Sequence, residues 1–112
     1  MHTVVETPPY LADAERLFTH AERATIVDQI SADPKIGLVI PGTGGIRKVR
    51  FGFGSRGKRG GARVIYVCGG DDMPVFLLAA FAKNEKTDLT PSERAVLSKS
   101  VTAMLADYRR QR

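Results

Sequence analysis

The sequence has no tryptophan, a single cysteine and no long apolar run. The lone Cys68 excludes a disulfide framework or a cysteine metal cluster within one chain. Without an uninterrupted apolar run of about 18 residues, the chain has no candidate transmembrane helix. Its N-terminal residues also lack the basic-then-apolar order of a signal peptide. We therefore expect a cytoplasmic protein that makes no contact with a membrane.

Acidic residues are missing from about a third of the chain. Residues 34 to 70 contain all eleven glycines and no aspartate or glutamate, whereas the remainder contains nine basic and twelve acidic residues. The eight basic residues of this stretch are Lys35, Arg47, Lys48, Arg50, Arg56, Lys58, Arg59 and Arg63. A cationic stretch in an otherwise mildly acidic chain predicts a polyanion as the partner.

Histidine is also scarce, with only His2 and His20 present. Each lies far in sequence from the basic stretch, so we expect a structural or solvent-exposed position for both. The basic stretch offers no carboxylate cluster for a hard cation. We therefore expect neither a metal nor another cofactor.

With 112 residues and 43% hydrophobic composition, the chain suits one domain over residues 1–112. Apolar residues at helical spacing, preceded by capping residues or proline, predict helices that begin after Thr7, after Thr19 and at Pro91. Alternating apolar residues predict strands at 46–53, 62–68 and 75–82, with a short strand at 3–6 and an extended piece at 38–40.

The resulting order of elements is β-α-α-β-β-β-α. Three consecutive strands with short links favour an antiparallel meander, and we expect the helices to cover one face of it. The predicted class is therefore α+β.

Residues 52–61, GFGSRGKRGG, contain a GxGxxG motif and most of a Walker A motif. Both motifs bind phosphate because the glycine turn opens directly into a helix. Here Gly61 precedes ARVIYVC, which is typical of a strand, and Arg59 stands where the Walker motif needs Ser or Thr. We interpret this stretch as the basic tip of a hairpin; the alternative is a solvated turn with incidental charge.

Three blocks of the sequence resemble a known family. PGTGGIRKVRF, RGKRGGARVIY and FAKNEKTDLTPSE, at residues 41–51, 56–66 and 81–93, are similar to the RelE/HigB superfamily of toxins from bacterial type II toxin-antitoxin systems, in its HigB-like branch. The resemblance implies a RelE-like fold and a ribosome-dependent endoribonuclease that cleaves mRNA in the ribosomal A site and so inhibits translation. It also implies a cognate antitoxin, expected to be a helix-turn-helix protein encoded beside the toxin.

RNA cleavage through the 2′-hydroxyl requires a proton acceptor, stabilisation of the charged phosphorane and a proton for the departing 5′-oxygen. Lysine can move protons where neighbouring cations disfavour its charged form. Lys58, flanked by Arg56 and Arg59, is therefore the first candidate for this role. Lys83, at the end of the last strand, is the second.

The resemblance assigns Arg63 to the scissile phosphate and Lys86 to a phosphate or to proton donation. The predicted catalytic residues are thus Lys58, Arg63, Lys83 and Lys86, and the predicted RNA-binding residues are Arg47, Lys48, Arg50, Arg56, Arg59 and Asn84. RelE-branch relatives have arginine in place of Asn84 and tyrosine in place of Thr90, so the acid and the base stay unassigned.

Several alternatives remain open at this point. The period-two positions of Phe51, Phe53 and Phe81 favour core packing over stacking on a base, whereas Tyr66 fits either role. The basic residues at 47, 48 and 50 could form an ordinary solvated strand face. The alternative functions are a noncatalytic toxin, such as the ParE toxins that bind DNA gyrase, and an inactive RNA-binding module held by counterion release.

Overall fold

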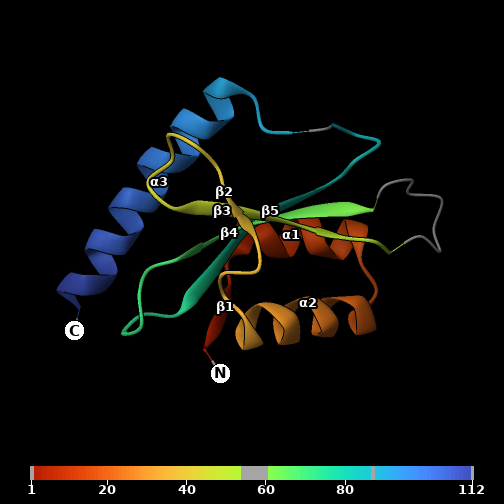
Figure 1. The fold of residues 1–112 in the computed structure, drawn as a ribbon, viewed down its shortest axis with the longest axis horizontal. Helices are drawn as coiled ribbons and strands as arrows, with labels where there is room; N and C mark the ends of the chain where they lie inside the picture. The colour runs from red at the N-terminus through yellow and green to blue at the C-terminus, as the bar shows by residue number, and fades with distance from the viewer. Residues whose placement is uncertain (1, 54–60, 87, 112) are drawn as a thin grey trace.

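The sheet lies between two helical layers in the computed structural model, which describes residues 2–53, 61–86 and 88–111 (Figure 1). The helices are α1 (Pro8–Leu17), α2 (His20–Ala32) and α3 (Pro91–Arg110). The strands are β1 (Val4–Glu6), β2 (Leu38–Val39), β3 (Ile46–Phe51), β4 (Ala62–Cys68) and β5 (Val75–Ala82). The predicted α+β class and order are confirmed, with β2 as the short extended piece.

The helix starts follow from local capping. In α2, the Thr19 hydroxyl accepts from the Glu22 N–H while the Glu22 carboxylate accepts from the Thr19 N–H, and Thr90 begins α3 in the same way. The predicted cap at Thr7 is wrong in its detail. Its hydroxyl makes no capping bond and instead donates to the Leu77 carbonyl oxygen at 2.7 Å.

The strands form one sheet in the order β1-β5-β4-β3-β2. The three long strands make the predicted antiparallel meander, and β2 extends it antiparallel to β3. The first strand pairs with β5 in parallel, a partner that the sequence pattern did not predict. Strand β3 ends at Phe51, two residues earlier than expected.

Alternation along the strands builds two apolar cores. On one face, residues such as Val64 and Leu77 pack with α1 and α2; on the other, residues such as Ile65 and Leu78 pack with α3. The expectation that all helices cover one face is therefore wrong, and α3 lies apart from the α1 and α2 pair in Figure 1. The physical reason is that β4 and β5 are apolar on both faces, so each face needs a cover.

The aromatic residues are mostly structural. Phe51 and Phe81 are buried, and Phe53 stacks on Phe51 with ring centroids 5.7 Å apart, as the alternation predicted. Tyr66 is fully buried. Its hydroxyl accepts from the Gly37 N–H at 2.9 Å and donates to the Pro34 carbonyl at 2.8 Å. Core packing is therefore its role.

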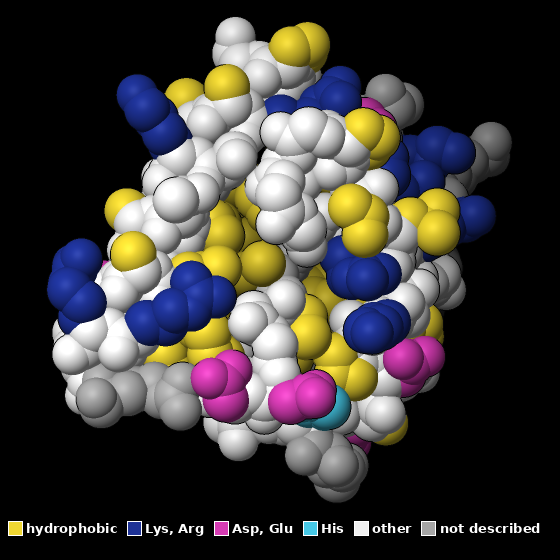
Figure 2. Space-filling view, turned by 60° about the vertical axis from the view of Figure 1, so that its left-hand side comes forward, with side chains coloured by type: hydrophobic (Ala, Val, Ile, Leu, Met, Phe, Trp, Pro, Cys, Tyr) yellow, Lys and Arg dark blue, Asp and Glu magenta, His cyan; other side chains and the backbone are white. Residues whose placement is uncertain are grey.

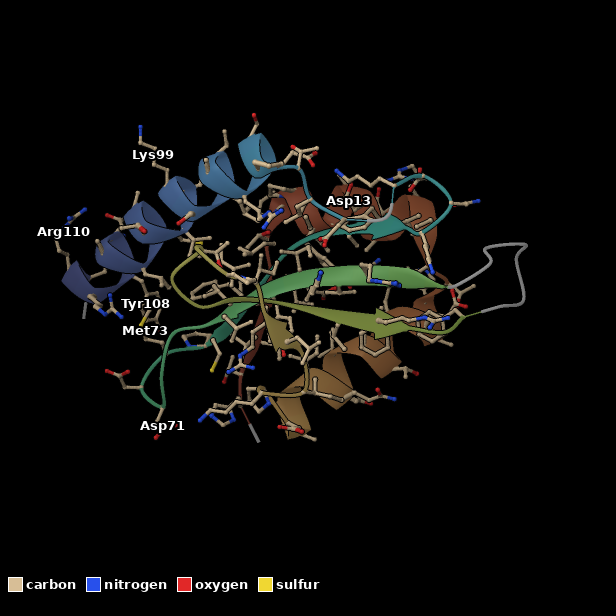
Figure 3. All side chains as sticks on the ribbon, turned by 45° about the horizontal axis from the view of Figure 1, so that its top comes forward. Asp13, Asp71, Met73, Lys99, Tyr108 and Arg110 are labelled. Carbon is tan, nitrogen blue, oxygen red and sulfur yellow. The ribbon has the colours of Figure 1, made fainter. Side chains whose placement is uncertain are left out.

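One edge of the sheet is closed by side chains. Strand β1 pairs only with the first three residues of β5, from Val75 to Leu77. Beyond them, the Ala80 N–H donates to Asp13 of α1 and the Ala82 N–H donates to Glu85, both at 3.0 Å. Figure 3 shows Asp13 beside this strand. Carboxylates thus occupy the backbone donors that β1 leaves uncovered.

The C-terminal helix is anchored by its apolar stripe. Val101 is buried, and Tyr108 packs edge-to-face on Phe76 with ring centroids 5.8 Å apart, next to Met73 in Figure 3. Within the described part of the chain, no helix has both the length and the hydrophobicity to span a bilayer.

Candidate functional site

Two arginines lie directly opposite each other on the sheet face that α3 covers in part. Arg50 of β3 pairs with Arg63 of β4, and residues in paired positions project from the same face. The next residue across the sheet is the buried Phe81 of β5. Because opposed like charges repel each other, an anion lying between the two guanidinium groups would be attracted by both.

Lys48 lies on the same face, two residues before Arg50 in β3. Its Nζ is 2.7 Å from Oδ2 of Asp88, in the segment between β5 and α3. The hydrogen bond from Lys48 is the main reason that the pKa of Asp88 lies below its ordinary value. The charge of Lys48 is therefore matched by a carboxylate within the protein.

The turn after β5 carries Lys83 and Asn84, whose side chains are both exposed. The backbone N–H of Lys83 donates to the Gly61 carbonyl oxygen at 3.1 Å. Gly61 stands immediately before β4, at the base of the basic loop. This bond therefore places Lys83 beside the start of β4.

Lys86 contacts the aromatic neighbour of Arg63. Its Nζ lies 5.2 Å from the centroid of the Phe81 ring and 2.6 Å from Oε2 of Glu93. The hydrogen bond from Lys86 is the first cause of the lowered pKa of Glu93. Lys86 thus lies beside the arginine pair but is tied to the start of α3.

Arg47 is not brought together with the predicted RNA ligands that the structure describes. Its direct pairing with Tyr66 places it on the opposite face from Lys48. Its Nη1 donates to the carbonyl oxygens of Gly37 at 2.7 Å and Lys35 at 3.4 Å. Arg47 therefore holds the segment before β2. Three further predicted residues, Arg56, Lys58 and Arg59, lie outside the described residues.

A hollow opens beside the arginine pair. It measures about 350 Å³ and is lined by Ile36, Leu38, Lys48, Val49, Arg50 and Arg63. Among the described residues, the lining thus combines three cations with apolar side chains and contains no acid. Figure 2 shows basic side chains interleaved with hydrophobic ones toward the right of the view. Such a lining suits a ligand that carries both negative charge and apolar surface.

A larger groove of about 580 Å³ lies between α1, β5 and the start of α3. Its floor is mainly apolar, and the charges on its rim pair with one another: Arg16 with Glu85, and Lys86 with Glu93. Arg50 and Arg63 do not line it. The smaller hollow is therefore the better candidate for binding an anion, despite its size.

The sequence reasoning missed Asp88, Ile36 and Leu38. Asp88 immediately precedes the apolar Leu89 and the Thr90 cap, but its partner Lys48 is forty positions away, so no local pattern relates the two. The apolar residues at 36 and 38 inside the basic stretch were a visible signal, because they alternate as in a strand. Among the described residues, no three His, Cys, Asp or Glu side chains gather to hold a metal ion.

A known protein family matches most of the chain. Residues 21–111 match the family described as the RelE toxin of the RelE/RelB toxin-antitoxin system. The match begins in α2, extends through the meander with the arginine pair, and ends at the last turn of α3. It thus covers most of the chain and every described residue of the candidate site. The chain belongs to the RelE family of toxins, whose systems pair the toxin with a RelB-type antitoxin.

Proposed function

We propose that the protein is a ribosome-dependent endoribonuclease of the HigB-like branch, which inhibits translation by cleaving mRNA in the cytoplasm without a metal ion. The observation that carries this proposal is the direct pairing of Arg50 with Arg63, on the face next to the turn that carries Lys83. Two guanidinium groups on directly paired residues suit a phosphodiester, because each can donate two parallel hydrogen bonds to phosphate oxygens.

The proposed reaction uses the RNA as its own nucleophile. The 2′-hydroxyl gives its proton to a base, its oxygen forms a bond to phosphorus, and the bond from phosphorus to the 5′-oxygen breaks. The departing 5′-oxygen takes up a proton, which leaves a 2′,3′-cyclic phosphate and a 5′-hydroxyl. The negative charge grows on the phosphorane oxygens, where Arg63 would stabilise it.

The lysines are the proposed proton carriers. Lys58 is flanked in sequence by Arg56 and Arg59, and positive neighbours favour the neutral form of a lysine. The backbone N–H of Lys83 donates to the carbonyl oxygen of Gly61, which directly follows residues 54–60 in the sequence. We assign Lys58 and Lys83 to proton transfer and Lys86 to phosphate binding, with Asn84 as a further RNA ligand. Arg47 lies on the other face of the sheet, so we give it no part in cleavage.

The test is to map the 5′ ends of a translated message after expression of the toxin. We expect cuts that follow the reading frame in the wild type and that disappear in Lys58→Ala and Arg63→Ala. Arg109→Ala, in the last turn of α3, is the matched control and should cleave like the wild type. Measuring the unfolding of each variant separates lost chemistry from lost folding.

Intact messages together with blocked DNA supercoiling would contradict the proposal and favour a gyrase-binding toxin. RNA binding without cleavage in any context would favour an inactive binding module. Co-expression of the adjacent antitoxin should suppress the cuts. A helix-turn-helix fold in that antitoxin would support the HigB-like assignment.

A further inference from the structure

Exposed apolar side chains are concentrated in β2 and just before it. Four large hydrophobic residues are exposed in the described part of the chain, and three of them fall between positions 36 and 39. Ile36 is 42% exposed, Leu38 is 74% exposed and Val39 is 48% exposed. Single exposed apolar residues are ordinary, but three within four positions are not, and those that share a face form a candidate contact surface.

This group is held on a rigid frame. The Gly37 N–H donates to the buried Tyr66 hydroxyl, and Arg47 donates to the Gly37 carbonyl oxygen. A Cβ at Gly37 would lie 2.7 Å from the Lys48 carbonyl oxygen and 2.9 Å from the Tyr66 ring, so the segment packs tightly against the sheet. The apolar side chains are therefore fixed in place from beneath while they face solvent.

Two of the three residues face the cationic hollow. Leu38 pairs with Lys48, so its side chain lies on the same face as Lys48 and Arg50. Ile36 and Leu38 both line the hollow, whereas Val39 pairs with Arg47 on the opposite face and does not. The apolar side chains of Ile36 and Leu38 thus reach the hollow from the segment at β2, and the cations from β3 and β4.

We propose that Ile36 and Leu38 form a shelf for one nucleobase of single-stranded RNA, whose adjoining phosphate lies on Arg50 and Arg63. This inference rests on the proposed function only in taking RNA as the ligand. A nucleotide places one negative charge next to one flat base with apolar faces. This matches a hollow that has apolar side chains from the β2 segment next to cations from β3 and β4. The shelf side chains have no polar atom, so they favour no particular base.

A protein segment fits this place less well. A strand added to this edge of the sheet would find only the two residues of β2 to pair with. A purely apolar segment would bring no negative charge to Arg50 and Arg63, which line the hollow. The hollow, of about 350 Å³, is also too small to receive a folded partner, but it is large enough for a ligand of small-molecule size.

The experiment compares two neighbouring residues of β2. Leu38→Ser removes the shelf, and Val39→Ser is the matched control, because it is also exposed but points to the other face. Each purified full-length variant is titrated with two probes. One is a fluorescent single-stranded RNA that is 2′-O-methylated and therefore cannot be cleaved, and the other is inorganic polyphosphate, which has charge but no bases.

Leu38→Ser should weaken RNA binding about five- to tenfold, the lower end of what loss of one base contact costs. Its affinity for polyphosphate should stay within about twofold of the wild type, because phosphate contacts dominate that interaction. Ile36→Ser should behave in the same way, and Val39→Ser should leave both affinities unchanged. The dependence of RNA affinity on salt should keep its slope, since no cation is removed.

An equal loss of affinity for RNA and for polyphosphate in Leu38→Ser would overturn the proposed base contact. Unchanged affinity for RNA in this variant would overturn it as well. Lost binding of the cognate antitoxin by Leu38→Ser, with RNA binding intact, would overturn it in favour of a protein-docking surface. The readout is independent of cleavage. A wild type that binds RNA through the shelf but cuts no message would contradict the proposed function alone.

Discussion

Gly61 allows the backbone at the start of β4 to approach the backbone at the end of β3 closely. Its φ is +71°, and a Cβ there would lie 2.1 Å from the Phe51 carbonyl oxygen. The same residue accepts the backbone hydrogen bond from Lys83. Any side chain at this position would force the strands β3 and β4 apart at the end that carries the arginine pair.

We predict that Gly61→Ala lowers the free energy of unfolding by at least about 1–3 kcal/mol, since a left-handed conformation alone costs this much for most residues. Urea denaturation measures the effect. Gly52→Ala is the control, because a Cβ at Gly52, just after β3, would meet no atom of the described residues within 4 Å. Equal effects of the two substitutions would show that the close approach at Gly61 is not needed.

Tyr66 makes the stability of the protein sensitive to alkaline pH. Burial raises the pKa of its phenol above the ordinary value, more than the hydrogen bond from Gly37 lowers it. In the unfolded chain the phenol titrates at about pH 10. The unfolded state therefore loses its proton first, and stability that is present at neutral pH is lost as the pH rises through the folded-state value.

We expect the free energy of unfolding to fall above about pH 10, and to fall less steeply in Tyr66→Phe. At neutral pH, Tyr66→Phe should be less stable by about 1–3 kcal/mol, because the Gly37 N–H and the Pro34 carbonyl lose their partner. Burial also raises the pKa of Tyr10, which both proteins retain, so the comparison isolates Tyr66. Parallel pH profiles would contradict this assignment.

At the scale of elements, the segment between β5 and α3 controls the charge of the candidate site. It carries Asp88, whose carboxylate pairs with Lys48. Both side chains are partly exposed, so the pair contributes little to stability. Its larger effect is to keep one cation of the hollow from binding phosphate.

We predict that Asp88→Asn tightens RNA binding and makes it more dependent on salt. Each additional phosphate contact on a single strand steepens the slope of log K against log salt by about 0.7. Asp107→Asn removes a carboxylate that pairs with Arg110 at the end of α3 and serves as the control of equal charge. An identical slope change in both variants would assign the effect to net charge instead of to Lys48.

The elements themselves were largely predictable, because their signals are local. The capping sequences at Thr19 and Thr90 determined where α2 and α3 begin. The parallel pairing of β1 was not predictable, since three residues with no turn nearby can pair with either edge. Likewise, the register that sets Arg50 opposite Arg63 depends on the exact loop closure, and a shift of one residue would move one arginine to the other face.

At the scale of the whole molecule, two cores share one sheet. The adjacent residues Leu77 and Leu78 of β5 are both buried, but they belong to different cores. We predict that Leu77→Ala and Leu78→Ala each lower the free energy of unfolding by about 2–5 kcal/mol. Because β4 and β5 contribute side chains to both cores, the two cores should unfold together. Far-ultraviolet circular dichroism should therefore show one transition in both variants. A biphasic curve in Leu78→Ala alone would mean that α3 unfolds independently.

At this scale the charge composition predicts a class of partner, but it does not predict the shape of the site. The absence of acids from residues 34 to 70 indicated a polyanion. The structure then brings Asp88, from outside that stretch, to Lys48, and directs Arg47 to the opposite face. Charge composition sums over residues, whereas a binding face depends on which side of a strand each residue occupies.

The carboxylates along β5 have a consequence for handling the protein at high concentration. An open strand edge is a template on which further chains can add and polymerise. Here Asp13 and Glu85 occupy the N–H groups of Ala80 and Ala82, so an incoming strand would have to displace two charged groups to pair. Strand addition along this edge is therefore disfavoured even when the toxin is not bound to its antitoxin.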